Sequence, residues 1–308
     1  MAIMSIRVES LTKYFGDQKA VDKVTFSVAS GEIAGFLGPN GSGKSTTMKC
    51  ICGVLPADQG DISVAGIGIN EDPMAIKKLI GYLPENNPLH PEMFIMEYLT
   101  HVDGFYNSPA KRLQRVKDVI GLTGLSREQH KRIGQLSKGF RQRVGLAQAI
   151  IHNPSVLILD EPTSGLDPNQ IVEIRNLISG LAKEKTVLLS THLLQEVEAI
   201  CDRIIVINNG QLVADATSES IKNMYTSKEQ SIYLEFGNTV DIEMLKRIKG
   251  VTIVSKISDK EFLVEGNPDT DLREAIFHFA SQNGLSLLTM QQKQHSLEKI
   301  FRELTGKS

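Results

Sequence analysis

The sequence predicts an α/β fold built on a mostly parallel β-sheet, followed by a smaller α+β domain. Three short apolar runs, at 33–37, 156–159 and 186–190, have the length of strands that are buried on both faces. Helical patterns at 140–152 and 170–183 alternate with these runs. Buried strands that alternate with helices usually form a parallel sheet covered on both sides.

The other elements of the first part of the chain follow from the same patterns. Two segments alternate apolar and polar residues as half-buried strands do, and a glycine-rich turn joins a buried strand to a helix. In order, we expect strands at 3–9, 24–28 and 33–37, a helix at 45–54 and a late strand at 203–208. From about 88 to 132 the pattern is mainly helical. We therefore expect an inserted helical subdomain that spans about 88–150.

After about Ile221 the pattern changes, and we divide the chain into domains at 1–221 and 222–308. The second part reads β-α-β-β-α-β-α, with a hairpin turn at 258–260. The expected elements are strands at 231–236, 251–257, 261–265 and 285–290, and helices at 240–248, 271–283 and 296–304. This order predicts a small α+β domain of ferredoxin-like character.

Composition limits the classes of function that remain. The 308 residues include 34 Lys and Arg and 36 Asp and Glu, so the formal net charge is −2. A nucleic-acid partner is not expected, because such proteins are usually strongly basic. No apolar run approaches the ~20 residues that cross a bilayer, and the N-terminus does not resemble a signal peptide. The three cysteines, Cys50, Cys52 and Cys201, fit a reducing compartment and buried positions.

A glycine-rich stretch at 38–45 carries the clearest chemical signal. It matches G-x-x-x-x-G-K-[ST] at every position and lies between a predicted strand and a predicted helix. In such a loop the backbone N–H groups and the helix N-terminus face phosphate oxygens. Lys44 would reach the β- and γ-phosphates, and the Ser45 hydroxyl would bind Mg²⁺. The phosphate-binding residues that we expect are Gly38, Pro39, Asn40, Gly41, Ser42, Gly43, Lys44, Ser45 and Thr46.

Two acids follow the apolar strand at 156–159. Asp160 would stand at the strand tip, where it can hold a water molecule bound to Mg²⁺. Glu161 could accept a proton from an attacking water. Two acids at the end of a strand are often only solvated side chains. Beside a complete phosphate loop, a metal residue and a general base are the better interpretation.

A third motif, Leu136-Ser137-Lys138-Gly139-Phe140-Arg141-Gln142-Arg143, resembles the LSGGQ signature of ABC transporter ATP-binding subunits. It departs from the usual form at Lys138 and Phe140 and keeps Ser137 and Gly139. A Ser N-cap and a bare Gly at a helix start can approach a γ-phosphate closely. From 127 to 143 there are six basic residues and one acid, which fits an anionic ligand or simply a solvated helix face.

Other motifs of this family occur in order, and the resemblance assigns them roles. Ser164-Gly165-Leu166-Asp167 resembles the D-loop, and His192 stands where the family has its switch histidine, which contacts the γ-phosphate. Phe15 stands where an aromatic ring stacks on adenine, with Tyr14 as its close competitor. The resemblance therefore implies Glu161, His192 and Lys44 as catalytic residues, ATP and Mg²⁺ as cofactors, and a P-loop NTPase fold of the ABC type with a mixed sheet.

Glu85 departs from the family pattern, which usually has Gln at this point. A glutamate can bind Mg²⁺ or hold a water, but it adds a negative charge, so a direct role as metal ligand stays open. By the same resemblance, the segment 87–105 would contact the membrane partner. Its residues Met93, Phe94, Ile95 and Met96 fit either a groove for a partner helix or buried helical core.

The resemblance also implies partners and a location. A separate integral membrane permease would be driven by two ATP-binding subunits, which form a homodimer on the cytoplasmic face of the inner membrane. The motif Tyr-Leu-Pro-Glu at 82–85, the signature at 136–143 and the closing Ser-Leu-Glu-Lys-Ile-Phe at 296–301 resemble exporter-type subunits with a short C-terminal domain. Phe-Leu-Gly-Pro-Asn-Gly at 36–41, followed by Tyr-Leu-Pro-Glu-Asn-Asn-Pro-Leu at 82–89, most resembles the gliding-motility-associated group of bacteria. The alternative is a soluble ABC ATPase that acts as a regulatory or mechanochemical factor without transport.

Overall fold

The computed structural model describes residues 4–217, 220, 230–267 and 271–293. The chain divides into two compact units, Met1–Ala216 and Thr217–Ser308, near the boundary expected at 221. In the first unit, apolar strands form one sheet in the order β10-β9-β3-β8-β7-β6. Its strands are β3 (Ile33–Leu37), β6 (Ile80–Leu83), β7 (Val156–Asp160), β8 (Thr186–Thr191), β9 (Arg203–Asn208) and β10 (Gln211–Thr217). From β9 to β6 every neighbouring pair is parallel, as the buried runs predict.

A second, antiparallel sheet gives the unit its mixed character. Its order is β2-β1-β4-β5, and it consists of β1 (Met4–Phe15), β2 (Gln18–Ala29), β4 (Gln59–Val64) and β5 (Ile67–Gly68). The expected strands at 3–9 and 24–28 are too short. The register between β1 and β2 shifts repeatedly after Val8, and these irregularities break the alternation by which a strand is detected in sequence.

Helix α1 (Lys44–Ile51) joins the two sheets into one core. Its residues Met48 and Ile51 are fully buried and pack with apolar side chains of both sheets. The helix ends before Gly53, whose φ of 66° lies in the left-handed region that stops helices. The expected helix end at 54 is therefore wrong by three residues.

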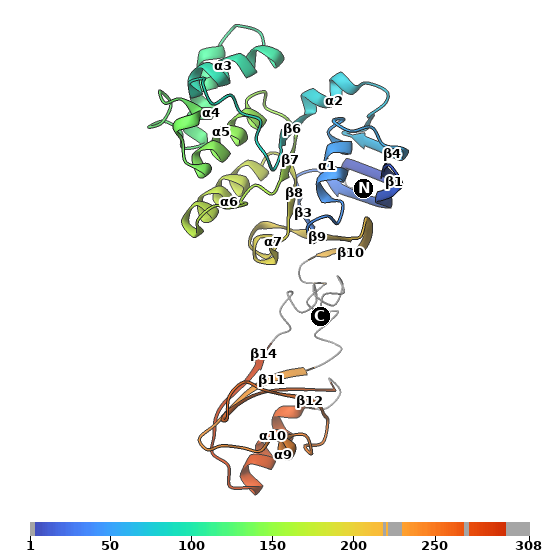
Figure 1. Cartoon of the computed structure of the whole chain (residues 1–308), viewed down its shortest axis with the longest axis vertical. Coiled ribbons are helices and arrows are strands. Elements are labelled where there is room, and N and C mark those ends of the chain that lie inside the picture. Colours follow the sequence, from blue (N-terminus) through green and yellow to red (C-terminus); the bar gives the residue numbers. More distant parts are fainter. Residues whose placement is uncertain (1–3, 218–219, 221–229, 268–270, 294–308) are drawn as a thin grey trace. The chain divides into compact units, whose positions relative to one another are not determined.

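The helical subdomain predicted between the strands is present. It contains α3 (Ile95–Tyr106), α4 (Arg112–Leu122), a short 3₁₀ turn (Ile133–Gln135) and α5 (Lys138–Ile150). Figure 1 shows these helices on one side of the parallel sheet, with α1 and the antiparallel sheet on the other. The remaining helices of the unit are α2 (Pro73–Leu79), α6 (Pro168–Ala182) and α7 (Leu194–Ile200).

The second unit has the element order that the sequence predicts as far as the structure describes it. An antiparallel sheet in the order β12-β13-β11-β14 packs on two helices through a separate apolar core. Its elements are β11 (Gln230–Phe236), α9 (Ile242–Leu245), β12 (Val251–Lys256), β13 (Glu261–Gly266), α10 (Leu272–Gln282) and β14 (Leu287–Lys293). This strand order is that of a ferredoxin-like fold. The helix expected at 296–304 lies outside the described residues.

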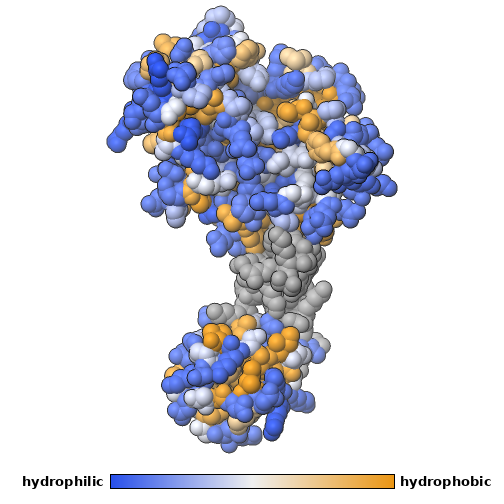
Figure 2. All heavy atoms as spheres, in the orientation of Figure 1, coloured by the Kyte–Doolittle hydropathy of each residue, from blue (hydrophilic) through white to orange (hydrophobic). Residues whose placement is uncertain are grey.

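The expected helix at 240–248 is shorter than predicted. After Leu245 the backbone N–H groups of Arg247 and Ile248 bond three residues back, so the last turn tightens and the α-helix stops. None of the described helices is both long and apolar enough to cross a bilayer. On the face of the first unit seen in Figure 2, hydrophilic side chains predominate, and apolar ones form small groups.

Gly35 controls how closely α7 approaches the parallel sheet. It lies in the middle of β3, and a methyl group added to it would come within 2.7 Å of Cγ1 of Val197 and 2.9 Å of Sγ of Cys201. We predict that Gly35→Val lowers the free energy of unfolding of the first unit by about 1–3 kcal/mol through overpacking. Urea unfolding measures this loss.

Gly121 provides the matched control, because it lies in α4 with open space around its Cα. Gly121→Ala should leave the urea midpoint unchanged or raise it, since alanine favours helix by up to about 1 kcal/mol over glycine. Equal midpoints for Gly35→Val and the wild-type chain would contradict the tight contact between β3 and α7.

Candidate functional site

The loop between β3 and α1 needs its glycines. Gly41 and Gly43 have φ values of 80° and 106°, which side chains with a Cβ rarely adopt. A Cβ at Gly38 would lie 2.4 Å from the carbonyl oxygen of Ile207 and 2.5 Å from Oγ of Ser42. The Ser42 hydroxyl itself is buried and has no hydrogen-bond partner among the described residues. The loop 38–46 is therefore a tight cradle, in which the Ser42 hydroxyl is available as a hydrogen-bond donor.

Lys44 begins α1 and turns back over this cradle. Its Nζ donates to the carbonyl oxygens of Gly38 at 2.7 Å and Pro39 at 3.2 Å. The same atom lies 3.6 Å from Oε1 of Glu161. Burial lowers the pKa of the Lys44 ammonium, and the charge of Glu161 opposes this effect. The lysine is therefore held where an anion can exchange for its present partners.

A cavity of about 210 Å³ lies over the loop. Its lining residues are Ala20, Asn40, Gly41, Gly43, Lys44, Ser45, Thr46, Glu85 and Glu161. All of them except Ala20 are residues that the sequence proposes for the site. Ala20 has no chemical signature; it belongs because β2 passes so close that a Cβ at Gly43 would meet its carbonyl oxygen at 2.7 Å.

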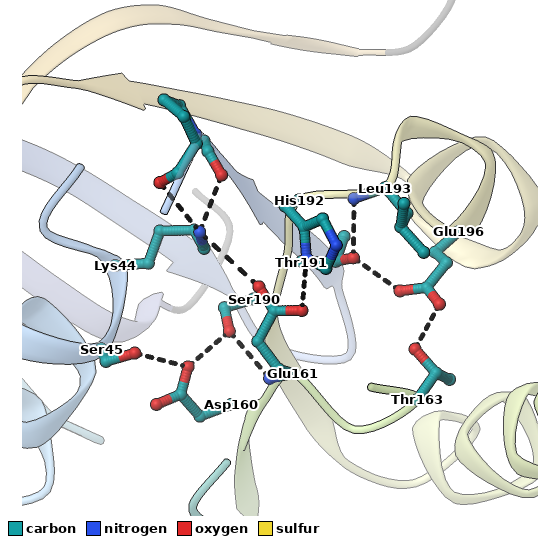
Figure 3. A network of polar contacts seen from close by, with 12 residues as sticks. Lys44, Ser45, Asp160, Glu161, Thr163, Ser190, Thr191, His192, Leu193 and Glu196 are labelled. Atoms are coloured by element: carbon teal, nitrogen blue, oxygen red, sulfur yellow. Dashed lines mark hydrogen bonds and ion pairs between the residues drawn. The ribbon is translucent and has the colours of Figure 1, made fainter. Parts of the chain in front are cut away.

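Asp160 ends strand β7 and faces the start of α1, as Figure 3 shows. Its Oδ1 accepts hydrogen bonds from the hydroxyls of Ser45 at 3.0 Å and Ser190 at 2.6 Å. The predicted metal pair, Ser45 and Asp160, is thus in contact. Ser190 was not foreseen from the sequence, because one serine in a buried strand carries no signal until the register of β7 and β8 sets it beside Asp160.

Glu161 adopts a left-handed backbone conformation with a φ of 49°, which is uncommon for a residue with a side chain. Its N–H donates to Oγ of Ser190 at 2.9 Å, and this bond helps to hold the conformation. The carboxylate turns toward His192, whose Nδ1 donates to Oε2 at 2.9 Å (Figure 3). Burial raises the pKa of Glu161, while the hydrogen bond and charge of His192 act in the opposite direction.

Of the remaining predicted residues, Glu85 lies in the phosphate cavity and the adenine-stacking candidate Phe15 lies outside it. Glu85 lines the phosphate cavity and acts electrostatically on Lys44. The aromatic candidates at the end of β1 do not line that cavity. Phe15 is 51% exposed and Tyr14 is 37% exposed, and each ring has a lysine ammonium near its face. The more exposed ring of Phe15 is the more accessible to a planar ligand.

The predicted signature residues lie away from the phosphate cavity of the same chain. Ser137 is the N-cap of α5 and accepts a hydrogen bond from the N–H of Phe140 at 3.4 Å. Gly139 is buried, and a Cβ there would meet the side chain of Gln170. Neither residue lines the phosphate cavity. Figure 1 shows α5 apart from α1, with strands of the sheet between them.

These features define a class of protein. A glycine-rich phosphate loop, a strand-end Asp-Glu pair and a histidine at the next strand end occur together in P-loop proteins that hydrolyse nucleotides. The fold agrees, because ligands of such sheets bind at the carboxyl ends of the parallel strands.

Comparisons with known proteins identify the family. The profile of the ABC transporter family matches residues 21–164. The bacitracin transport ATP-binding protein BcrA of Bacillus licheniformis is 32% identical over 98% of this chain and 97% of its own length. The Nod factor export ATP-binding protein I of Rhizobium sp. (strain N33) is 31% identical over 100% and 99%. This chain therefore belongs to the ATP-binding subunits of ABC transporters, a family of ATPases coupled to transport.

Solved structures agree with this assignment. An ATP-binding subunit of an ABC transporter superposes with a TM-score of 0.65 at 31% identity, covering 71% of this chain and 92% of that one. A dimeric bacterial ABC transporter cassette gives a TM-score of 0.63 at 27% identity, covering 69% and 98%.

The Glu161–His192 contact predicts a pH dependence. If Glu161 is the general base that the sequence predicts, kcat/KM for ATP should fall as the pH drops through the pKa of Glu161, which burial raises. The hydrogen bond and the charge of His192 lower the pKa of Glu161. In His192→Ala, the acidic limb of the residual activity should therefore move to higher pH.

The measurement is the pH profile of kcat/KM for both chains. Titration of the nucleotide itself is common to both profiles, so only the difference between them counts. An acidic limb that stays in place or moves to lower pH in His192→Ala would show that this hydrogen bond does not tune Glu161.

Proposed function

We propose that this chain hydrolyses ATP with Glu161 as general base and that closure of two such chains drives a separate membrane permease. The observation that carries the proposal is the position of Glu161. Its buried carboxylate lies in the phosphate cavity, 3.6 Å from the lysine of the P-loop and 2.9 Å from His192. A base beside both a phosphate-binding cation and an orienting histidine is arranged for attack of water on a γ-phosphate.

The cradle binds the phosphates before chemistry begins. Backbone N–H groups of 38–46 and the N-terminus of α1 supply positive potential. Lys44 would leave the carbonyl oxygens of Gly38 and Pro39 for the β- and γ-phosphate oxygens, which attract its charge more strongly. Phe15, at the exposed end of β1, would stack on the adenine.

The residues present also fit a magnesium ion. The hydroxyl of Ser45 and the carboxylate of Asp160 already lie within 3.0 Å of each other, and hard oxygen ligands suit Mg²⁺. The described residues hold no group of three or more His, Cys, Asp or Glu side chains able to bind a metal. This fits Mg²⁺ in nucleotide sites, which is held by one or two protein ligands with phosphates and water. When bound, the ion would neutralise charge that develops on the phosphates. Glu85, in the same cavity, would act as a ligand directly or through water.

Hydrolysis then follows from the positions of this chain's own groups. Glu161 takes a proton from water as the water oxygen forms a bond to the γ-phosphorus. The bond from that phosphorus to the β–γ bridging oxygen breaks, and ADP and inorganic phosphate are released. His192 orients the carboxylate through Nδ1 and leaves its other ring nitrogen to face the transferred phosphoryl group.

A second copy of the chain would complete the site. Ser137 and Gly139, at the start of α5, do not line the phosphate cavity of their own chain. Packed head to tail in a homodimer, each chain would offer this helix start to the γ-phosphate bound by the other. Hydrolysis would remove the bridging phosphate and open the pair, which is a population shift driven by differential affinity.

The permease would contact a cavity of about 530 Å³ next to the phosphate site. Its lining includes Tyr82, Glu85, Tyr106 and His152, and it adjoins the segment 87–105 that we expect to meet the membrane partner. Glu85 lines both this cavity and the phosphate cavity. Ser45 lines both cavities as well, so a helix of the permease docked here would be linked to the nucleotide by two residues.

The relatives support an exporter, since one of them is named for Nod factor export. Within the exporters, we propose the gliding-motility-associated group on the basis of the motifs at 36–41 and 82–89. The complex would sit on the cytoplasmic face of the inner membrane, with this chain peripheral to it. The second unit would stabilise the dimer or regulate it.

Glu161→Gln tests the proposed base. The amide keeps the size and polarity of the side chain but cannot accept a proton, so ATP turnover should fall at least about 100-fold, the lower end of the range for a general base. ATP affinity should be kept. With ATP and Mg²⁺, the variant should accumulate as a dimer in light scattering. Turnover at the wild-type rate would remove Glu161 from this role.

Lys44→Ala is the companion variant that separates binding from chemistry. It should weaken ATP binding and leave the chain monomeric under the same conditions, because the main cation of the cradle is gone. ATP affinity equal to that of the wild-type chain would contradict the assignment of the phosphates to this loop.

Phe105→Ser tests the docking surface. Phe105 is 71% exposed at the end of α3, so removing its ring should cost little stability. The variant should keep the ATPase rate of the isolated chain and lose copurification with the membrane protein encoded by the adjacent gene. Leu113→Ser, on the neighbouring helix and 56% exposed, is the control and should keep that partner. Equal recovery of the partner with both variants would place the permease elsewhere.

A further inference from the structure

A third buried carboxylate lies behind the catalytic pair. Glu196, near the start of α7, is 3% exposed. Its Oε2 accepts a hydrogen bond from Oγ1 of Thr191 at 2.6 Å, and its Oε1 accepts one from Oγ1 of Thr163. Figure 3 shows the carboxylate between these two hydroxyls, one from the end of β8 and one from the turn after β7. Within the described part of the chain, no cation is paired with it.

Each threonine lies next to one of the proposed catalytic groups, Thr163 in the turn after Glu161 and Thr191 at the end of β8. Thr163 is two residues beyond Glu161, in a turn closed by the N–H of Ser164 on the carbonyl of Glu161 at 3.1 Å. Thr191 directly precedes His192, and its Oγ1 also accepts the N–H of Leu193 at 3.0 Å. One carboxylate therefore connects the turn after the proposed base to the strand end that precedes the histidine.

The charge of Glu196 is the unusual part of this arrangement. A buried carboxylate is costly unless its lone pairs are satisfied, and this one stands close enough to Glu161 to raise the pKa of that residue. A site for a polyanion gains nothing from another negative charge. Its presence is explained if it holds the two threonines in position. An ionised carboxylate can accept hydrogen bonds from both hydroxyls at once, and these bonds are stronger than those to a neutral amide.

We propose that Glu196 is a positioning residue for ATP hydrolysis, which sets the distance between Glu161 and His192 by fixing Thr163 and Thr191 to one carboxylate. The proposal rests on Glu161 as the base. It assigns to Glu196 no contact with nucleotide or metal. These two hydrogen bonds of Glu196 affect the reaction rate, because misplacement of a catalytic group by about 1 Å can reduce the rate about 100-fold.

The experiment compares kcat, KM and ATP affinity of the full-length chain with those of four variants. Glu196→Ala should lower kcat by about tenfold or more, while ATP affinity stays within about twofold, because only the geometry of the transition state is lost. Glu196→Gln should recover part of the rate, since its amide oxygen can accept from one hydroxyl. Thr163→Val should lower kcat by itself and have no further effect in the Glu196→Ala background.

A control variant and a second readout separate this role from a general structural one. Glu184→Ala removes an exposed carboxylate after α6 and should match the wild-type chain in every measurement. The split between kcat and ATP affinity gives the second readout, because a general loss of structure would lower both.

Three results would overturn the proposal. One is an unchanged kcat in Glu196→Ala. Another is a loss of kcat with an equal loss of ATP affinity. The third is additivity of Thr163→Val with Glu196→Ala, which would show that the two residues act independently. If Glu196→Ala does not fold, Thr163→Val and Glu196→Gln decide by the same criteria, and an unchanged kcat in both refutes the proposal. If Glu161→Gln turns over at the wild-type rate, the proposed base itself fails, which is a separate outcome.

Discussion

Three carboxylates buried at one edge of the parallel sheet, Asp160, Glu161 and Glu196, constrain the whole site. Each is held by one of three consecutive residues, the last two of β8 and the histidine after it: Ser190 bonds Asp160, Thr191 bonds Glu196 and His192 bonds Glu161. Buried acids are tolerated only when they are bonded, so the position of this strand end fixes all three. The ammonium of Lys44 lies 3.6 Å from Glu161.

The rest of the fold keeps that strand end in place. Strand β8 lies between β3, which leads into the P-loop, and β7, which carries the acids, so parallel pairing brings all three strand ends to one edge. Gly35 lets α7 pack directly on β3 and thereby sets the depth of Glu196. The antiparallel sheet closes the other side of α1 and brings Ala20 against Gly43. The packing of apolar residues thus fixes the positions of the polar side chains in the site.

Sequence patterns predicted the parts of this arrangement that depend on local order. The P-loop motif, the apolar strand before Asp160 and the succession of helices and strands along the second unit all follow from contiguous residues. The residues missed depend on long-range pairing: Ser190 gains its role from strand register, and Glu196 from two threonines 33 and 5 residues away. The antiparallel sheet was underestimated because register shifts in β1 disturb its alternation. A sequence motif identifies the loop that binds phosphate. The residues that hold this loop in place are brought to it by the pairing of distant strands and helices.

We infer that the cavity over 38–46 binds the phosphates of ATP with Glu161 at the γ-phosphate. A crystal structure of the Glu161→Gln chain grown with ATP and Mg²⁺ would show this binding. In it we expect Nζ of Lys44 to have left the carbonyl oxygens of Gly38 and Pro39 for the phosphates, with Ser45 and Asp160 around the metal. Phosphates bound outside this cradle, or a Lys44 still bonded to both carbonyls beside bound ATP, would contradict it.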